Sequence, residues 1–374
     1  MAQVVLVAPD KFKGSLTAAE VAAAVAAGVR RVCADAEVTV VPVADGGDGT
    51  LAAFVAAGFT EVPVTAAAPT GEKLCTSYAR QRDLAVVEMA DVSGLARLPG
   101  PLAPMQATSR GTGEVIAAAI DNGCRRIVLG IGGSACTDGG AGLVQALGAR
   151  LLDADGHQIG DGGVSLPDLV AADFAPMRDR LAGVQLTVAC DVDNPLTGPR
   201  GAAAVYSPQK GAQPGQVLAL DDALTHWADQ VSAVTGADHR DAPGAGAAGG
   251  VGFAAIALLD AELRSGIDLV LELVGFYGQL DGVDLVVTGE GALDEQTLHG
   301  KAPAGVAKAA RRAGIHVVAV CGHNTLDRSQ LRAAGISTAY ALTDLEPDVQ
   351  RCIQQGAPLL ERLGERIAAE HLSY

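Results

Sequence analysis

Lysine, aspartate and glycine recur together along this chain in short segments that suit the chemistry of phosphate and metal ions. The segment APDKFKGS, at residues 8–15, places Lys11 and Lys13 between an apolar run and a predicted helix. Backbone N–H groups approach a phosphate closely where glycine removes the Cβ, and lysine adds positive charge. We therefore interpret this segment as a phosphate grip in which Lys11 acts in catalysis. A solvated loop, with Asp10 as a turn residue, is the alternative.

Two carboxylates, Asp45 and Asp48, stand three residues apart among three glycines in the segment DGGDGT. Such a pair could coordinate a metal ion or accept a proton from a reacting hydroxyl. DG pairs also form ordinary tight turns. The density of glycine favours a functional loop, and we predict that either Asp45 or Asp48 is the general base.

The segment TSRGTGE, at residues 108–114, opens a predicted helix and contains Ser109 and Arg110. A guanidinium group can hold a carboxylate through two parallel hydrogen bonds. We therefore expect Arg110 to bind a substrate carboxylate, with Ser109 and Lys13 as further substrate-binding residues. A cluster of helix N-capping residues would explain the same letters.

The segment GIGGSACTDGGAG follows a predicted strand at 127–131 and is the strongest candidate for a loop that binds a nucleotide phosphate. Two glycine patterns, at 130–135 and 244–249, match dinucleotide-binding motifs in letters and leave a dehydrogenase as an alternative. However, the first is not followed at once by a helix, and no strand precedes the second. Cys136 as a nucleophile has no evident histidine partner. The later segments SPQKG and TGEGALD each add one residue to this loop. The predicted contacts with ATP and its phosphates are Gly132, Gly133, Ser134, Asp138, Gly139, Lys210 and Glu290.

Oxygen ligands gather after a predicted strand at 184–190, in the segment CDVDNP. We expect Asp191 and Asp193 to bind Mg²⁺ or its waters, and Asp191 to belong to the catalytic group. The spacing does not fit an EF-hand. Around Lys301 the spacing does not fit a P-loop either, so the predicted ATP site belongs to another class.

The elements that must position these segments fall into two groups. Apolar runs at 4–8, 38–43, 283–288, 316–321 and 337–342 predict five buried strands, which alternate with helices at 17–32, 303–313 and 349–370. This order predicts a parallel sheet covered by helices, with ligands at the carboxyl ends of its strands. A hairpin at 74–89, strands at 127–131 and 184–190 and a helix at 216–234 lie between the two chain ends. We predict one α/β domain from residues 1–70 and 280–374, and an inserted mixed α/β domain at 71–279.

Composition excludes several classes of function. With 374 residues the chain is long enough for two domains, and its formal net charge of −16 disfavours nucleic acid as a partner. Seven cysteines without a CxxC pair indicate reduced thiols in a cytoplasmic protein, without a structural zinc site. No signal peptide and no long apolar stretch is evident, so we expect no membrane partner. A homodimer remains open.

Taken in order, these segments resemble the glycerate kinase type-1 family. The matching pieces are APDKFKGSL, PVADGGDGT, ATSRGTGE, IGGSACTDGGAG, CDVDNPLTGPRGAA, YSPQKGA, PGAGAAGGVG and TGEGALDEQTLHGKAP. The resemblance implies phosphorylation of D-glycerate by ATP with Mg²⁺, giving 2-phosphoglycerate more often than 3-phosphoglycerate. It also implies two α/β domains, one of them flavodoxin-like, with the active site in the cleft between them. A kinase of another small hydroxy acid and a non-catalytic sensor of sugar acids are the alternatives.

Overall fold

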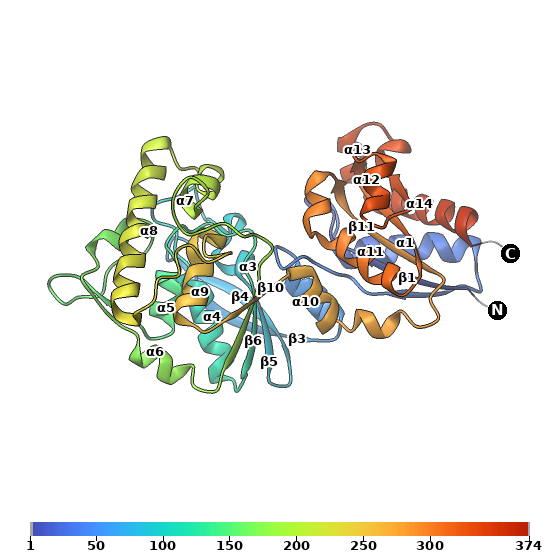
Figure 1. Ribbon diagram of the computed structural model, residues 1–374. Helices are drawn as coiled ribbons and strands as arrows, with labels where there is room; N and C mark the ends of the chain where they lie inside the picture. The colour runs from blue at the N-terminus through green and yellow to red at the C-terminus, as the bar shows by residue number, and fades with distance from the viewer. Residues whose placement is uncertain (1–2, 373–374) are drawn as a thin grey trace. The chain divides into compact units, whose positions relative to one another are not determined.

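The computed structural model describes residues 3–372 and divides into two compact units (Figure 1). The terminal unit comprises Met1–Asp45, Ala52–Gly58 and Ser265–Tyr374. The inserted unit comprises Gly46–Leu51 and Phe59–Arg264. Each unit has its own sheet and is described by itself.

The sheet of the terminal unit is built from both chain ends, as the sequence predicts. Within residues 3–372 it has five strands, all paired in parallel, in the order β13-β12-β11-β1-β2. Counted along this unit alone, the order is 2-1-3-4-5, which is the flavodoxin order. The strands are β1 (Val4–Pro9), β2 (Glu37–Val40), β11 (Leu285–Leu293), β12 (His316–Asn324) and β13 (Thr338–Ala341).

The direction of the connections reverses between β1 and β11, which makes their carboxyl ends the topological switch point of this sheet. The register pairs Pro9 with Gly289, so the residues after β1 lie beside the final part of β11. The backbone N–H of Asp10 continues this ladder by donating to the Gly289 carbonyl at 2.7 Å. Two segments 280 residues apart in sequence thereby share one sheet edge.

Local sequence signals explain the helices of the terminal unit. Thr17 caps α1 in a capping box with Glu20, as predicted. Gly28 of α1 and Gly364 of α14 let these two helices touch: a Cβ on Gly28 would lie 2.0 Å from the Glu361 carbonyl oxygen. The helices are α1 (Ala18–Val32), α2 (Thr50–Ala56), α10 (Gly266–Leu273), α11 (Ala302–Arg312), α12 (Arg328–Ala333), α13 (Val349–Gln354) and α14 (Gly356–His371), with short 3₁₀ turns η5 (Phe276–Gln279), η6 (Glu295–His299) and η7 (Leu342–Asp344). The first two residues of α2 belong to the inserted unit.

Two expectations about the terminal unit are wrong. The single helix predicted at 349–370 is broken at Gln355 into α13 and α14. Pro358 explains the break, because it has no N–H to donate to the Gln354 carbonyl and its ring would clash there. The strand predicted at 38–43 ends at Val40, and β2 is a largely exposed edge strand instead of a buried one.

The inserted unit carries a mixed sheet of order β10-β9-β6-β5-β4-β3. The predicted hairpin is confirmed, since β4 and β5 pair in antiparallel fashion, while β5, β6, β9 and β10 are parallel. The strands are β3 (Thr60–Ala67), β4 (Lys73–Gln81), β5 (Leu84–Glu88), β6 (Arg126–Gly130), β9 (Gln185–Ala189) and β10 (Glu262–Arg264), beside a small antiparallel pair, β7 (Arg150–Leu152) and β8 (Ala171–Asp173).

Helices cover this sheet, and one aromatic cluster marks the core of the inserted unit. Trp227 of α8 is fully buried and meets Phe174 and Phe253 edge to face at 6.3 and 6.5 Å. The helices are α3 (Met89–Ser93), α4 (Arg110–Asp121), α5 (Ala141–Ala146), α6 (Ala175–Arg180), α7 (Ala202–Tyr206), α8 (Pro214–Thr235) and α9 (Val251–Leu258), with 3₁₀ turns η1 (Leu95–Arg97), η2 (Gly163–Asp168), η3 (Pro208–Lys210) and η4 (Ala247–Gly250).

The borders of the compact units differ from residues 70 and 280, the domain boundaries expected from the sequence. Residues 59–67 belong to the inserted unit because β3 pairs along its whole length with β4. Residues 265–280 belong to the terminal unit, where Ile267 of α10 packs against Gly305 of α11. Among residues 3–372, no helix combines the length and the apolar character needed to cross a bilayer.

Candidate active site

Three carboxylates influence one another at the switch point of the terminal unit. Asp10 follows β1, Glu290 lies in β11, and Asp45 lies in the coil between β2 and α2. Asp10 is 8% exposed, and its pKa is raised to about 7, first by burial and then by the negative charge of Asp45. The N–H of Lys11, which donates to Asp10 at 2.6 Å, acts against this rise. Asp10 is therefore a carboxyl group poised to gain or lose a proton near neutral pH.

Glu290 is held by partners from the turn that follows β11. Burial raises its pKa, while the Thr297 hydroxyl, which donates to it at 2.5 Å, and the charge of Lys301 lower it. The Lys301 ammonium lies 3.6 Å from Glu290 and 4.0 Å from Asp294. Asp294 in turn caps η6 by accepting from the N–H groups of Gln296 and Thr297. A lysine thus bridges two carboxylates at the end of β11.

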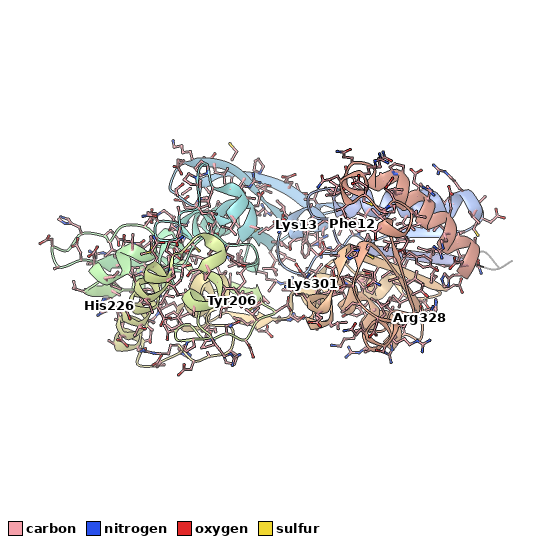
Figure 2. The ribbon with its side chains drawn as sticks, turned by 90° about the horizontal axis from the view of Figure 1, so that it is seen from above. Phe12, Lys13, Tyr206, His226, Lys301 and Arg328 are labelled. Atoms are coloured by element: carbon pink, nitrogen blue, oxygen red, sulfur yellow. The ribbon has the colours of Figure 1, made fainter. Side chains whose placement is uncertain are left out.

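The lysine-bearing loop after β1 lies beside the same strand. A Cβ on Gly291 would lie 3.4 Å from the backbone nitrogen of Lys13, so Gly291 admits the loop closely. Gly14 has φ +77°, a value that suits glycine, and it completes the turn. Lys13 is exposed and Lys11 is half-buried. Figure 2 labels Lys13 and Lys301, which both belong to the terminal unit.

In the inserted unit, Glu88 anchors the loop 46–51, which contains most of the segment DGGDGT. Its carboxylate accepts hydrogen bonds from the N–H groups of Gly49, at 3.0 Å, and Leu51, at 2.7 Å. Burial is the main cause that raises the pKa of Glu88 to about 7. Asp48 is exposed on this loop. The division of the chain into units therefore separates Asp45 from Asp48, although the two residues are only three positions apart in the sequence.

Two of the predicted glycine segments pack against each other in the inserted unit. A Cβ on Gly130 would lie 2.5 Å from the Gly46 carbonyl oxygen, and one on Gly132 would lie 2.6 Å from the Gly47 Cα. Only glycine allows two backbones to come this close. The loops 46–51 and 130–140 therefore form one glycine-lined edge beside the ends of β5 and β6.

Lys210 is a buried residue that holds the loop 130–140 through hydrogen bonds. It is 2% exposed, and its ammonium group donates to the Ser134 hydroxyl at 2.9 Å and to the Cys136 carbonyl at 2.5 Å. Its expected contact with phosphate would have to be indirect, through the loop it holds. Cys136 is fully buried with a pKa raised well above its ordinary value by burial, which suits a packing thiol. The next helix begins only at Ala141, so the dinucleotide-binding geometry is absent here.

Asp138 joins this loop to the start of α4. It is fully buried and accepts from both the N–H and the hydroxyl of Ser109 at 2.8 Å. It also accepts from the N–H groups of Gly140, at 3.1 Å, and Gly142, at 3.3 Å. In this arrangement, Ser109 and Asp138 hold the backbone in place. Gly139, with φ +63°, lies against Trp227, whose indole N–H donates to its carbonyl at 3.0 Å.

Arg110 lies at the start of α4 with half of its guanidinium group engaged. Asp161 accepts a hydrogen bond from Nε at 2.8 Å and forms an ion pair with Nη2 at 2.7 Å, while Nη2 donates a hydrogen bond to Gln145 at 3.0 Å. Within residues 3–372, Nη1 has no hydrogen-bond acceptor. The side chain is 28% exposed. Arg110 could therefore bind a carboxylate through one amino group, and not through the whole fork.

The predicted metal ligands lie after β9 and are exposed. The Asp193 side chain is 77% exposed and pairs with Arg200 at 3.1 Å. The neighbouring Asn194 is engaged by the Tyr206 hydroxyl at 2.5 Å. In the part of the chain that the structure describes, no group of three or more His, Cys, Asp or Glu side chains has the arrangement of a metal site.

The predicted residues thus form two groups, one in each unit. Lys11, Lys13, Asp45 and Glu290 belong to the terminal unit, and the remaining candidates belong to the inserted unit. Sequence reasoning missed several residues that complete these groups. The missed residues are Asp10, Glu88, Asp161, Asp294, Thr297 and Lys301. A charged residue that directly follows or ends an apolar strand run was the available signal for Asp10 and Glu88. Asp294 ends the candidate segment TGEGALD and Lys301 follows it, but no role in the site was assigned to them, and no pattern marked the other two.

Comparisons with known proteins agree over nearly the whole chain. Residues 5–372 match the model of the glycerate kinase family. The chain is 43% identical over 369 residues to a glycerate kinase of Bacillus subtilis (strain 168), covering 98% of this chain and 97% of that protein. It is 44% identical over 342 residues to a glycerate 2-kinase of Escherichia coli (strain K12), covering 90% of each. A crystal structure of a candidate glycerate kinase 2 from Salmonella typhimurium LT2 matches with a TM-score of 0.86 and 40% identity, over 99% of this chain and 98% of that one.

Proposed function

Because the chain belongs to the glycerate kinase family, we propose that it transfers the γ-phosphoryl group of ATP to the 2-hydroxyl of D-glycerate, giving 2-phospho-D-glycerate and ADP. The observation that carries this proposal is the full-length similarity to proteins named glycerate kinase, with a glycerate 2-kinase among them. The 3-hydroxyl is the competing acceptor.

The reaction breaks the bond between the γ-phosphorus and the bridging oxygen of ADP, and forms a bond from that phosphorus to the glycerate oxygen. The hydroxyl proton must pass to a base. We assign this role to Asp45, which lies in the carboxylate group of the terminal unit with Asp10 and Glu290. Asp48, the other predicted base, is exposed and belongs to the inserted unit. General-base assistance is typically worth about 10²- to 10⁴-fold in rate.

Anionic groups of the substrates require positive charge and N–H donors. We propose that Lys11 and the loop 132–140 bind the phosphates, and that Lys210 keeps this loop in place from beneath. For the glycerate carboxylate we propose Nη1 of Arg110 together with Lys13, while Ser109 fixes the start of α4. In this assignment Asp138 and Ser109 are positioning residues.

Pairs of carboxylates in the chain offer the oxygen ligands that a magnesium ion prefers. When bound, Mg²⁺ would neutralise charge that develops on the transferring phosphoryl group. Protein sites for Mg²⁺ often use one or two carboxylates, the rest of the shell being water and phosphate. We propose Asp191 and Asp193 for this role, as the pair that the sequence indicates. Asp10 and Asp45 are a second candidate pair, because their mutual repulsion would be relieved by a cation.

The decisive experiment is to incubate the protein with ATP, Mg²⁺ and D-glycerate and to identify the product by ³¹P NMR. A 2-phosphoglycerate resonance supports the proposal, whereas 3-phosphoglycerate would reassign the acceptor hydroxyl. Turnover with tartronate or L-lactate but not D-glycerate would identify a kinase of another hydroxy acid. Binding of D-glycerate without consumption of ATP would favour a sensor.

We propose a cytoplasmic location and a dimeric assembly for this protein. The use of ATP and seven cysteines without a CxxC pair favour a cytoplasmic protein. We also propose a homodimer, which light scattering of the purified protein at several concentrations would test. A mass of one chain throughout would exclude it.

A further inference from the structure

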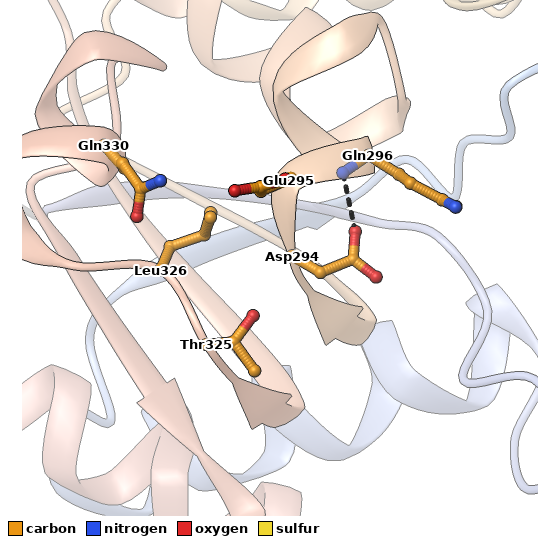
Figure 3. A pocket seen from close by; sticks show the side chains of 6 residues that line it. All are labelled: Asp294, Glu295, Gln296, Thr325, Leu326 and Gln330. Carbon is orange, nitrogen blue, oxygen red and sulfur yellow. Dashed lines mark hydrogen bonds between the residues drawn. The ribbon is translucent and has the colours of Figure 1, made fainter.

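A hollow of about 390 Å³ opens at the carboxyl ends of β11 and β12, within the terminal unit (Figure 3). Its lining residues come from the turn after each strand and from the first turn of α12; they are Asp294, Glu295, Gln296, Thr325, Leu326 and Gln330. The carboxyl ends of the strands are the edge where parallel sheets bind ligands, and β11 is one of the two strands at the switch point. The place in the fold therefore favours a binding site.

The lining offers one apolar surface between polar groups. Leu326 is 6% exposed and forms the apolar part of the wall. Figure 3 shows Glu295 and Gln330 pointing toward each other on either side of it. The Gln330 carbonyl oxygen accepts from the Asp327 N–H at 2.9 Å, while its amide nitrogen and the Glu295 carboxylate have no partner among the described residues. An apolar surface flanked by a donor and an acceptor suits a flat, polar-edged ring.

The charges of the lining restrict which part of a ligand can enter. Two carboxylates, Asp294 and Glu295, would repel both a phosphate and the carboxylate of D-glycerate. A neutral group with hydroxyls that donate to carboxylate oxygens would be favoured instead. The Lys301 ammonium group lies 4.0 Å from the carboxylate of Asp294, which lines the hollow, and 3.6 Å from the carboxylate of Glu290. The positive charge of Lys301 therefore lies between the hollow, at Asp294, and the switch point, at Glu290.

We propose that this hollow binds the nucleoside part of ATP. The adenine ring lies on Leu326 between Glu295 and Gln330, the ribose hydroxyls donate to Asp294, and the phosphates leave past Lys301. The inference rests on the proposed function, since it names where that reaction would hold its nucleotide. It makes Gln330 and Glu295 determinants of the preference for one nucleoside triphosphate over another.

The test uses the full chain and two variants, Gln330→Ala and Glu295→Ala, with Gln350→Ala in exposed α13 as the matched control. Calorimetric titration with ADP alone, without D-glycerate, measures the nucleotide site directly. Each lost hydrogen bond should weaken ADP binding by about threefold to tenfold. The KM for ATP should rise by the same factor, with the KM for D-glycerate and the affinity of the control unchanged.

Asp294→Asn adds a second line of evidence, because asparagine keeps the cap of η6. It should reduce the preference for ATP over 2′-deoxy-ATP. Unchanged ADP affinity in all three lining variants would overturn the inference, as would a rise in the KM for D-glycerate alone. The ADP titration needs no turnover. An inactive protein that still loses ADP affinity in the variants would therefore overturn the proposed reaction and keep the nucleoside site.

Discussion

The carboxylate of Asp138 accepts hydrogen bonds from both the backbone N–H and the hydroxyl of Ser109, each at 2.8 Å. Asp138 also holds the N–H groups of Gly140 and Gly142, and all four residues are buried. A carboxylate that satisfies several buried donors is expensive to remove, because each donor would be left without an acceptor. These hydrogen bonds indicate that Asp138 has a structural role, although its sequence context predicts a contact with phosphate.

Asp138→Ala should therefore destabilise the inserted unit by on the order of 3 kcal/mol, as measured by urea unfolding. Ser109→Ala removes one hydroxyl and should lower the free energy of unfolding by about 1 kcal/mol. Should Asp138→Ala unfold within about 0.5 kcal/mol of the parent protein yet lose activity, Asp138 would have to act on the substrate itself.

A substitution of Lys210 tests whether this residue acts by positioning the loop and not by contacting the phosphates. Lys210→Met keeps the length of the side chain and removes the two hydrogen bonds to the loop 132–140. We expect kcat to fall by roughly tenfold to a hundredfold, and the amides of this loop to exchange faster with deuterium. Because the buried ammonium group also loses hydration in the fold, the free energy of unfolding should change by less than about 2 kcal/mol.

The control for this prediction is Lys308→Met, which removes an exposed lysine from α11. It should leave both kcat and the exchange of the loop unchanged. A full loss of ATP binding in Lys210→Met, with the loop still protected, would contradict the positioning role and return Lys210 to the phosphate.

The sequence allowed prediction of elements whose signals are local. The capping box of Thr17 and Glu20 and the apolar runs of β1, β11, β12 and β13 depend on neighbours within a few residues. The break between α13 and α14 was equally local, since Pro358 is visible in the sequence, but the amphipathic pattern on both sides concealed it.

The parts of the site that could not be predicted depend on partners far along the chain. Asp10 has a raised pKa because of burial and of Asp45, which is 35 positions away. Glu88 gains its role only when the loop 46–51 folds against the end of β5. The close spacing of Asp45 and Asp48 suggested that they act in one loop, but the two residues belong to different compact units.

The raised pKa of Asp10 predicts how stability depends on pH. In the unfolded chain this carboxyl ionises near 3.8, whereas in the folded protein it ionises at about 7. Between these values the folded state binds more protons, so the free energy of unfolding should fall as pH rises from about 4 to about 7. The difference corresponds to at most on the order of 4 kcal/mol. In Asp10→Asn this part of the pH dependence should vanish, as urea unfolding at pH 5 and pH 8 would show.

Added Mg²⁺ should reveal which carboxylate pair binds it. If the ion binds Asp10 and Asp45, it competes with the proton, and the stabilisation by Mg²⁺ should be greater at pH 8 than at pH 5. This dependence should disappear in Asp10→Asn and persist in Asp191→Asn. Stabilisation by Mg²⁺ that is similar at pH 5 and pH 8, persists in Asp10→Asn and is lost in Asp191→Asn would support the pair Asp191 and Asp193. Exposed Asp35→Asn, as the control, should behave as the parent protein does.

The identity of the base can be tested with Asp45→Asn and Asp48→Asn. Asp45 shares the switch point with Asp10 and Glu290, where a carboxylate can accept the proton of a hydroxyl in a partly buried setting. Its replacement should lower kcat by roughly a hundredfold or more, with the KM for ATP nearly unchanged. Asp48 is exposed on a loop that Glu88 holds through backbone N–H groups, so Asp48→Asn should lower kcat by less than about tenfold. A deeper loss in Asp48→Asn than in Asp45→Asn would transfer the role of base to the inserted unit. Near-normal turnover in both variants would exclude either aspartate.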